Sequence, residues 1–280
     1  MQEIHWLTFF RDMYQRFIDD EVTALAAQLA YFLILAVFPF LIFLLALLAY
    51  TPLTIEMAYD FVRILPAAAA DTLVRNIMEI SSNRNHALLS FSMIATLWAA
   101  STGFNAIIRG INRAYKEKET RPFWKLLLTS LISTILLALV IISALFMLVL
   151  GRIIGEDLFA LLGLSTIFAM VWQWIRWVLP FIVMLLVFIL MYRYTPDRNL
   201  SFREVLPGAI FATLGWGIAS AAFSYYVNEF GRYAQIYGSI GGIIILLVWL
   251  YLCSIIILLG GEINASLASI KKDERLIKEI

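Results

Sequence analysis

The sequence predicts an all-α membrane protein with six transmembrane helices. Three observations predict this fold: hydrophobic residues form 62% of the 280-residue chain, charged residues form only 15%, and the mean hydropathy is +0.87. Soluble domains typically carry roughly 45–50% apolar and about 25% charged residues. The excess of apolar residues is too large for a protein core alone, and we expect it to face lipid.

The apolar residues lie in six runs, each close to the ~20 residues that a helix needs to cross a bilayer. The runs are continuous and lack the alternating pattern of transmembrane barrel strands. Turn signals or charged residues separate neighbouring runs. The predicted spans cover residues 25–50, 87–108, 126–150, 177–194, 205–228 and 239–261.

Basic residues predict the orientation of the spans, because short loops rich in Lys and Arg stay on the cytoplasmic side. With the N-terminus inside, the inner segments hold most of the 21 basic residues. The outer side keeps Arg63, Arg75, Arg84, Arg152, Arg176 and Arg232. We therefore predict one membrane domain over residues 1–280, with an N-terminal segment 1–24 and a C-terminal tail 265–280 that both lie in the cytoplasm.

Several segments between the spans are predicted to lie on the membrane surface. Residues 6–18 form an amphipathic helix, which serves as an anchor or, alternatively, as a partner site. Its apolar face carries Trp6, Phe9, Phe10, Met13, Tyr14, Phe17 and Ile18, and its polar face carries Thr8, Arg11, Asp12, Gln15 and Arg16. Residues 53–86 and 153–170 predict further interfacial helices, and Trp172, Trp174 and Trp177 then form an aromatic belt.

Stripes of small residues predict which spans pack most closely, because helices in lipid approach each other where side chains are small. Spans two and five carry such stripes and are expected to be central. The stripes are Ser92, Ala95, Ala99, Thr102 and Ala106, and Gly208, Ala212, Gly215, Ala219 and Ala222. Pro39 and Pro180, in spans one and four, suggest an inverted repeat of three spans each, with chance coincidence as the alternative.

Polar residues at membrane depth are costly and mark candidate sites. An inner cluster is predicted at the cytoplasmic ends of spans one, two and six, where Arg109 and Glu262 could form a pair. Its residues are Gln28, Asn105, Arg109, Asn112, Glu262 and Asn264. The cluster either fixes the helices in register or binds an anionic headgroup or a coupling ion.

An outer cluster is predicted in the short turn between spans five and six. Glycines on both sides of this turn permit tight backbone geometry. The polar and aromatic residues of the turn are Asn228, Glu229, Arg232, Tyr233, Gln235 and Tyr237. A second binding site and a purely structural turn are equally compatible with this pattern.

The sequence offers no familiar catalytic or metal-binding motif. The two histidines, His5 and His86, fall on opposite sides of the predicted topology, and Cys253 is the single cysteine. Walker, HExxH and dinucleotide-binding motifs are absent. We therefore predict no catalytic residue, no metal and no cofactor. The basic stretch 109–125 favours a cytoplasmic loop over a polyanion site, so nucleic acid is not an expected partner.

Several blocks of residues follow one another along nearly the whole chain. They are Leu29-Ala30-Tyr31 with Phe38-Pro39, Leu97-Trp98-Ala99-Ala100-Ser101, Arg109 to Tyr115, Glu119 to Trp124, Tyr192-Arg193-Tyr194 with Pro196, Leu206 to Ala209, Phe230-Gly231, Tyr237 to Gly242, Trp249-Leu250-Tyr251 and Gly261 to Ala265. In combination they resemble the YihY/BrkB family of bacterial inner-membrane proteins. The resemblance implies a cytoplasmic-membrane protein for which no catalytic residues are agreed. Ribonuclease and virulence labels accompany some members, and no nuclease constellation occurs in these residues.

We expect a transporter or flippase-like protein for an amphipathic or anionic envelope substrate. This expectation rests on six spans, on the prolines at membrane depth, on polar clusters at both membrane faces and on the missing catalytic motifs. The alternatives are a non-transporting membrane scaffold or accessory subunit and, with less support, an enzyme. Expected partners are membrane lipids, together with a second copy of the chain or an envelope protein.

Overall fold

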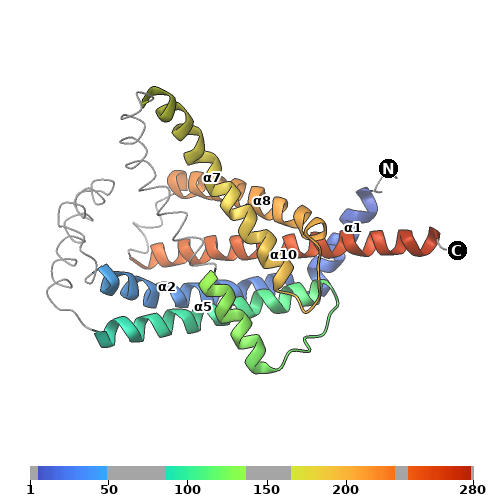
Figure 1. Cartoon of the computed structure of the whole chain (residues 1–280), viewed down its shortest axis with the longest axis horizontal. Coiled ribbons are helices and arrows are strands. Elements are labelled where there is room, and N and C mark those ends of the chain that lie inside the picture. The colour runs from blue at the N-terminus through green and yellow to red at the C-terminus, as the bar shows by residue number, and fades with distance from the viewer. Residues whose placement is uncertain (1–5, 49–85, 137–164, 231–238, 279–280) are drawn as a thin grey trace. The chain divides into compact units, whose positions relative to one another are not determined.

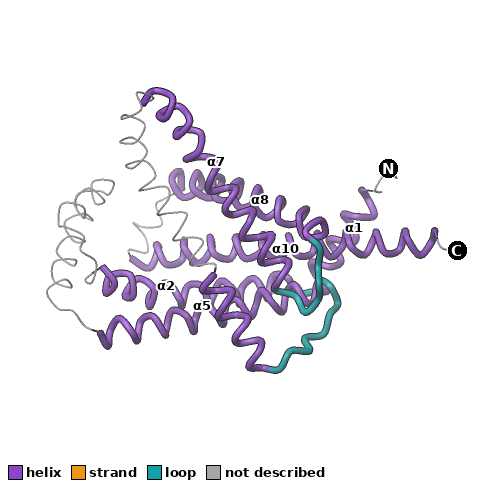
Figure 2. The backbone as a smooth tube through the Cα atoms, viewed as in Figure 1, coloured by secondary structure: helices purple, strands orange, loops and turns teal. Residues whose placement is uncertain are grey.

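The computed structural model describes residues 6–48, 86–136, 165–230 and 239–278, which form helices joined by short loops (Figures 1 and 2). These ranges contain no strand, which confirms the predicted all-α class for them. The helices are α1 (Trp6–Asp19), α2 (Val22–Leu48), α5 (His86–Ala114), the helix Phe123–Leu136, α7 (Ser165–Tyr194), α8 (Phe202–Phe230) and α10 (Ser239–Lys278).

Four segments of these helices are long and apolar enough to cross a membrane: Val22–Phe43, His86–Ala114, Phe202–Val227 and Gly241–Ile270. Phe123–Leu136 and Val178–Tyr194 are apolar but shorter. The third predicted span, 126–150, continues into residues outside the described ranges. The chain is thus a helical membrane protein, and its count of six spans stays a prediction.

The distribution of side chains is the one expected of helices in lipid. Large apolar side chains face outward, with Phe91 73% and Ile218 70% exposed. Polar side chains such as Ser254, Asn264 and Glu262 are buried among the helices. Water would favour the opposite arrangement, whereas in hydrocarbon each polar group must find a partner inside the protein.

The chain divides into two compact units, which we describe separately. The smaller unit, residues 32–100, contains the later part of α2 and the first half of α5. Ser92 and Ala99, two members of the predicted stripe on span two, are buried there. The Ser92 hydroxyl donates to the carbonyl of Leu88 at 2.7 Å, so it is satisfied within its own helix.

The larger unit, residues 1–31 and 101–280, is built around α10. α10 packs along α8 and, near the C-terminal end of the chain, against α1. Val22 and Ala26 at the start of α2 pack with Leu258 of α10 in a small buried core. Trp216 of α8 and Trp249 of α10 stack edge to face, with ring centroids 6.2 Å apart.

α8 and α10 meet at a glycine crossing, the contact of Gly208 with Gly260. A Cβ atom on Gly208 would overlap the carbonyl oxygen of Gly260 and the amide of Asn264. The two backbones therefore touch directly, as small residues permit in membrane helices. The first part of the predicted stripe on span five lies at this contact, since Gly208 and Ala212 are buried and Gly215 faces Ile256, whereas Ala222 at its other end is exposed.

The two prolines that suggested an inverted repeat lie inside continuous helices. α2 runs through Pro39 and α7 runs through Pro180 without a break. α7 also begins at Ser165, so residues 165–170 of the predicted interfacial stretch 153–170 belong to this helix. Of the predicted interfacial segment 53–86, residues 53–85 lie outside the described residues and His86 begins α5. The repeat itself stays a prediction.

Candidate functional site

Polar contacts gather where α1, the end of α5 and the later part of α10 meet. Arg16 of α1 lies at the centre, with its side chain only 11% exposed. Its Nε donates to Asp12 at 2.7 Å, and its Nη1 donates to the carbonyl of Ala114 at 3.1 Å. The same Nη1 lies 4.0 Å from Oε2 of Glu262, whose side chain is 2% exposed. We call these contacts, with the hydrogen bond from Ser266 to Asp12, the α1 anchor.

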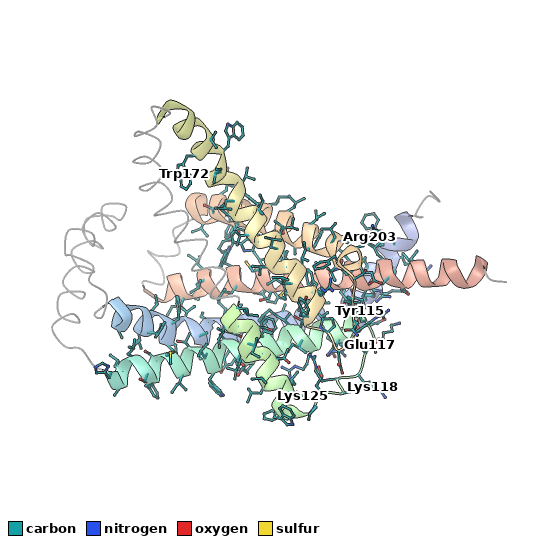
Figure 3. The ribbon with its side chains drawn as sticks, in the orientation of Figure 1. Tyr115, Glu117, Lys118, Lys125, Trp172 and Arg203 are labelled. Atoms are coloured by element: carbon teal, nitrogen blue, oxygen red, sulfur yellow. The ribbon has the colours of Figure 1, made fainter. Side chains whose placement is uncertain are left out.

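Charges flank the α1 anchor on its α5 side. Arg113 pairs with Glu21 at 2.7 Å and approaches Asp20 at 3.9 Å. Tyr115 is buried, and its hydroxyl has no hydrogen-bond partner in the described part of the chain. Figure 3 shows Tyr115, Glu117 and Lys118 together where α5 ends and the following loop begins. Burial raises the pKa of Tyr115, and the charges of Glu204 and then Glu262 contribute in the same direction, so this phenol stays neutral.

A second set of contacts joins the loop after α5 to the loop after α7, and we call it the loop network. Arg121 donates two hydrogen bonds to Glu119, at 2.6 and 2.7 Å, and a third to the carbonyl of Thr195 at 3.0 Å. Asp197 accepts from both the amide and the hydroxyl of Thr120. Asn112 connects the two loops, because its amide donates to Glu119 while its oxygen accepts from the Asp197 backbone.

The hydrogen-bond partners in the loop network and the α1 anchor shift the pKa values of the carboxyl groups there. The hydrogen bonds from Arg121 lower the pKa of Glu119 below its ordinary value, and those from Thr120 lower the pKa of Asp197. In the α1 anchor, burial raises the pKa of Asp12, but the hydrogen bonds from Ser266 and Arg16 more than offset it and leave the pKa lowered. Burial prevails at Asp20, whose pKa is raised.

An open apolar groove of about 430 Å³ adjoins the loop network. It lies between α5, the helix Phe123–Leu136 and α7, and its lining is Phe104, Thr129, Ile132, Ser133, Leu136, Val187, Leu190, Met191, Tyr194 and Thr195. Thr195 also accepts the hydrogen bond from Arg121, so one end of the groove meets the loop network. Ile132, Leu136, Leu190 and Tyr194 are exposed, so the groove opens sideways from the helices.

A cation lies next to Tyr194 at this end of the groove. The guanidinium of Arg193 is 3.8 Å from the ring centre of Phe202 and 5.5 Å from that of Tyr194. Within the described part of the chain Arg193 forms no ion pair, and its guanidinium contacts the aromatic faces of Phe202 and Tyr194. Its charge is therefore available to an anionic group.

The six residues of the predicted inner cluster do not form one site, because those with hydrogen bonds or ion pairs each have a different partner. Asn105 accepts a hydrogen bond from Ser130, Asn264 accepts one from the amide of Gly208, and Asn112 belongs to the loop network. Arg109 is exposed, Gln28 is half-buried, and Arg16 rather than Arg109 is the cation beside Glu262. Among the described residues none of the six side chains bonds to another.

The predicted outer cluster falls mostly outside the described residues. This applies to Arg232, Tyr233, Gln235 and Tyr237. Asn228 and Glu229 form part of the last turn of α8. A site in this turn stays a prediction.

The sequence analysis did not identify the α1 residues that lie beside Glu262. Asp12 and Arg16 were assigned to the solvent face of an interfacial helix, but they face α10 instead. Over residues 9–19 of α1 the exposed side chains are Phe10, Tyr14 and Ile18 together with Arg11, Gln15 and Asp19. A signal was present, because an Asp and an Arg four residues apart form a pair on one helix face.

Comparisons with known proteins agree with this architecture. The family described as virulence factor BrkB matches residues 13–279 of the chain. A ribonuclease-like protein of Bacillus subtilis, YfkH, is 45% identical over 95% of this chain and 97% of its own length. A UPF0761 membrane protein of Aliivibrio salmonicida is 29% identical over 99% of this chain and 87% of its own. No solved structure matches the chain.

The apolar helices and their buried polar contacts define an α-helical integral membrane protein. Within this class, the chain belongs to the virulence factor BrkB family, as its match over residues 13–279 establishes. The resemblance derived from the sequence blocks is thereby confirmed.

Proposed function

We propose that this protein is a flippase-like transporter of the bacterial cytoplasmic membrane, with both termini in the cytoplasm, and that its substrate is an amphipathic or anionic envelope molecule. The observation that carries the proposal is the apolar groove whose end meets the loop network. An amphipathic molecule needs an apolar surface for its tail and polar groups for its head, and ligand sites combine these features.

Two further features support this substrate class. The groove opens sideways through exposed apolar side chains, so an acyl chain could enter it from the bilayer without crossing water. Arg193 lies beside Tyr194 at the end of the groove and forms no ion pair in the described part of the chain. A headgroup phosphate or carboxylate would supply the missing negative charge.

The buried ionisable groups favour a transporter over a scaffold. Glu262 lies inside Gly241–Ile270, a segment apolar enough to span the membrane. Ionisable residues at such positions are expensive and usually mark a pathway for ions or substrate. We propose no enzymatic activity for this protein.

A membrane scaffold is the second candidate, and one observation favours it. Phe10, Tyr14 and Ile18 form an exposed apolar stripe on α1. A partner protein, rather than lipid headgroups, could cover this stripe. The scaffold would bind that partner without moving any lipid.

Flux in proteoliposomes tests the proposal. Purified protein should move a fluorescent anionic phospholipid between leaflets faster than protein-free vesicles do. Ser133→Trp fills the groove with an indole and should abolish most of this flux. Ile135→Trp lies on the same helix but outside the groove lining, and should retain it.

Either of two results would contradict the proposal. Equal flux in both tryptophan variants would remove the groove from the pathway. The absence of flux for every envelope lipid tested would favour the scaffold.

A further inference from the structure

Glu262 is a buried carboxylate with an incomplete set of partners. Its Oε2 atom has no hydrogen-bond donor among the described residues, and the cation that pairs with it there, Nη1 of Arg16, is 4.0 Å away. This distance allows Coulomb attraction but exceeds that of a hydrogen bond. Arg16 is closer to another carboxylate, because its Nε contacts Asp12 at 2.7 Å.

A count of charges around Glu262 leaves one negative charge in excess. α1 contributes Asp12 and Arg16, the turn after it contributes Asp20 and Glu21, and the end of α5 with the turn that follows contributes Arg113 and Lys116. Together with Glu262 this gives four carboxylates against three cations. Tyr115, which follows α5, is uncharged, and the nearby Glu204 and Arg198 add one charge of each sign, so the excess stays at one. One proton on the buried Glu262 would balance these charges.

The α1 anchor also provides a route for that proton. Ser266 lies four residues after Glu262, so both side chains share one face of α10. The Ser266 hydroxyl donates to Asp12 at 2.6 Å, and the Asp12 side chain is 38% exposed. Water can therefore reach Asp12, while Glu262 lies behind it at 2% exposure.

We propose that Glu262 is a proton-binding site reached through Asp12 and Ser266, and that proton binding loosens the α1 anchor. A hydronium ion protonates Asp12 and leaves water. Asp12 then gives a proton to the Ser266 oxygen while the Ser266 hydroxyl passes its own proton to Oε2 of Glu262, so Glu262 becomes neutral and Asp12 is ionised again. Arg16 then loses its attraction to α10 and keeps its bonds to Asp12 and the Ala114 carbonyl. The proposal goes beyond the proposed function and does not depend on it.

Infrared spectroscopy of the full-length protein in detergent tests the binding step. As the pH is lowered, the wild type should develop the carbonyl band of one protonated carboxylic acid that Glu262→Gln lacks. Asp197→Asn, a change in the loop network away from Glu262, should retain this band. A Glu262→Gln spectrum identical to that of the wild type would overturn the proposal.

Arg16→Gln provides a test that keeps Glu262 in place, should Glu262→Gln fold poorly. It removes the cation that pairs with Glu262, so the band should persist to higher pH than in the wild type. If the band appeared at the same pH as in the wild type, the charge of Arg16 would have no effect on proton binding at Glu262. That result would overturn the proposal.

Hydrogen exchange at neutral pH tests the coupling to α1. Glu262→Gln mimics the protonated state, so the amides of residues 6–19 should exchange faster than in the wild type, while Asp197→Asn leaves them unchanged. Equal exchange in all three proteins would overturn the coupling. Lipid flux is not measured in these experiments, so a failure of the transporter proposal would leave their outcome intact.

Discussion

At the scale of single residues, a direct backbone contact between Gly208 and Gly260 sets how closely α8 and α10 pack. Gly208 and Gly260 leave no room for a side chain, and Asn264 accepts the Gly208 amide at 2.7 Å. The hydroxyl of Tyr192 in α7 adds a hydrogen bond to the carbonyl of Ile257 at 2.6 Å. Three helices are thus joined through main-chain atoms, where even a methyl group matters.

Gly208→Ala should destabilise the protein because its new methyl group would overlap the Gly260 carbonyl. We expect a loss of about 3 kcal/mol, the upper end of the usual cost of overpacking. Thermal unfolding in detergent measures it. Gly242→Ala is the matched control, since nothing lies within 4 Å of its added Cβ. An equal effect of both variants would show that the crossing is not tight.

Lys116 has a left-handed backbone, with φ of 56°, and closes the end of α5. The Lys116 amide bonds to the carbonyl of Arg113 and the Glu117 amide to that of Asn112, a pattern that usually has glycine at this position. Lys116→Gly should therefore be more stable than Lys116→Ala by about 1 kcal/mol. Both variants lose the same charge, so their free energies of unfolding can be compared directly. Equal values would contradict backbone strain at position 116.

At the scale of elements, the loop network fixes the ends of α5 and α7 relative to each other. Its members on the α5 side come from the resemblance blocks Arg109 to Tyr115 and Glu119 to Trp124. The sequence did not indicate that Asn112 joins these blocks to Asp197. Periodicity predicts which face of a helix is polar. It does not predict which loop a polar face contacts, because that depends on the turn geometry of residues 115–122.

Acid should loosen the loop network. Glu119 and Asp197 have lowered pKa values, so their stabilising contribution is complete above the ordinary values of 4.5 and 3.8. It is lost as the pH falls through the lowered values of the folded state. Hydrogen exchange of residues 115–122, corrected for intrinsic rates, should accelerate in that range. Asp197→Asn should reduce this pH dependence, whereas Glu117→Gln, which removes only a pair with Arg198, should retain it.

At the scale of the whole molecule, composition and apolar runs predicted the class correctly, because the cost of exposing polar backbone to lipid leaves few alternatives. The small-residue stripe also placed Gly208 at a helix contact. The site was predicted only in part: Glu262 and Asn264 were named, but Arg16, Asp12 and Ser266 were not. Asp12 and Arg16 belong to a helix far from Glu262 in the sequence, on the face that the pattern assigned to solvent. Ser266 lies only four residues after Glu262, but its contact with Asp12 spans 254 residues, and sequence spacing does not reveal such a contact.

Labelling of single cysteines should test the predicted topology. In a Cys253→Ser background, an impermeant maleimide should react with Arg63→Cys and Arg232→Cys in intact cells. Lys118→Cys and Arg275→Cys should react only after permeabilisation. Labelling of Lys118→Cys from outside would reverse the predicted orientation.

The continuity of α10 from Ser239 to Lys278 has a mechanical consequence. At 1.5 Å per residue its 40 residues extend for about 60 Å, roughly twice the hydrocarbon thickness of a bilayer. Much of this rod must therefore tilt within the membrane or project beyond it. Glu262 lies partway along this helix. A small rotation of α10 at the α1 anchor would therefore produce a larger displacement at the C-terminal end of α10, and a fluorophore attached there could measure that displacement.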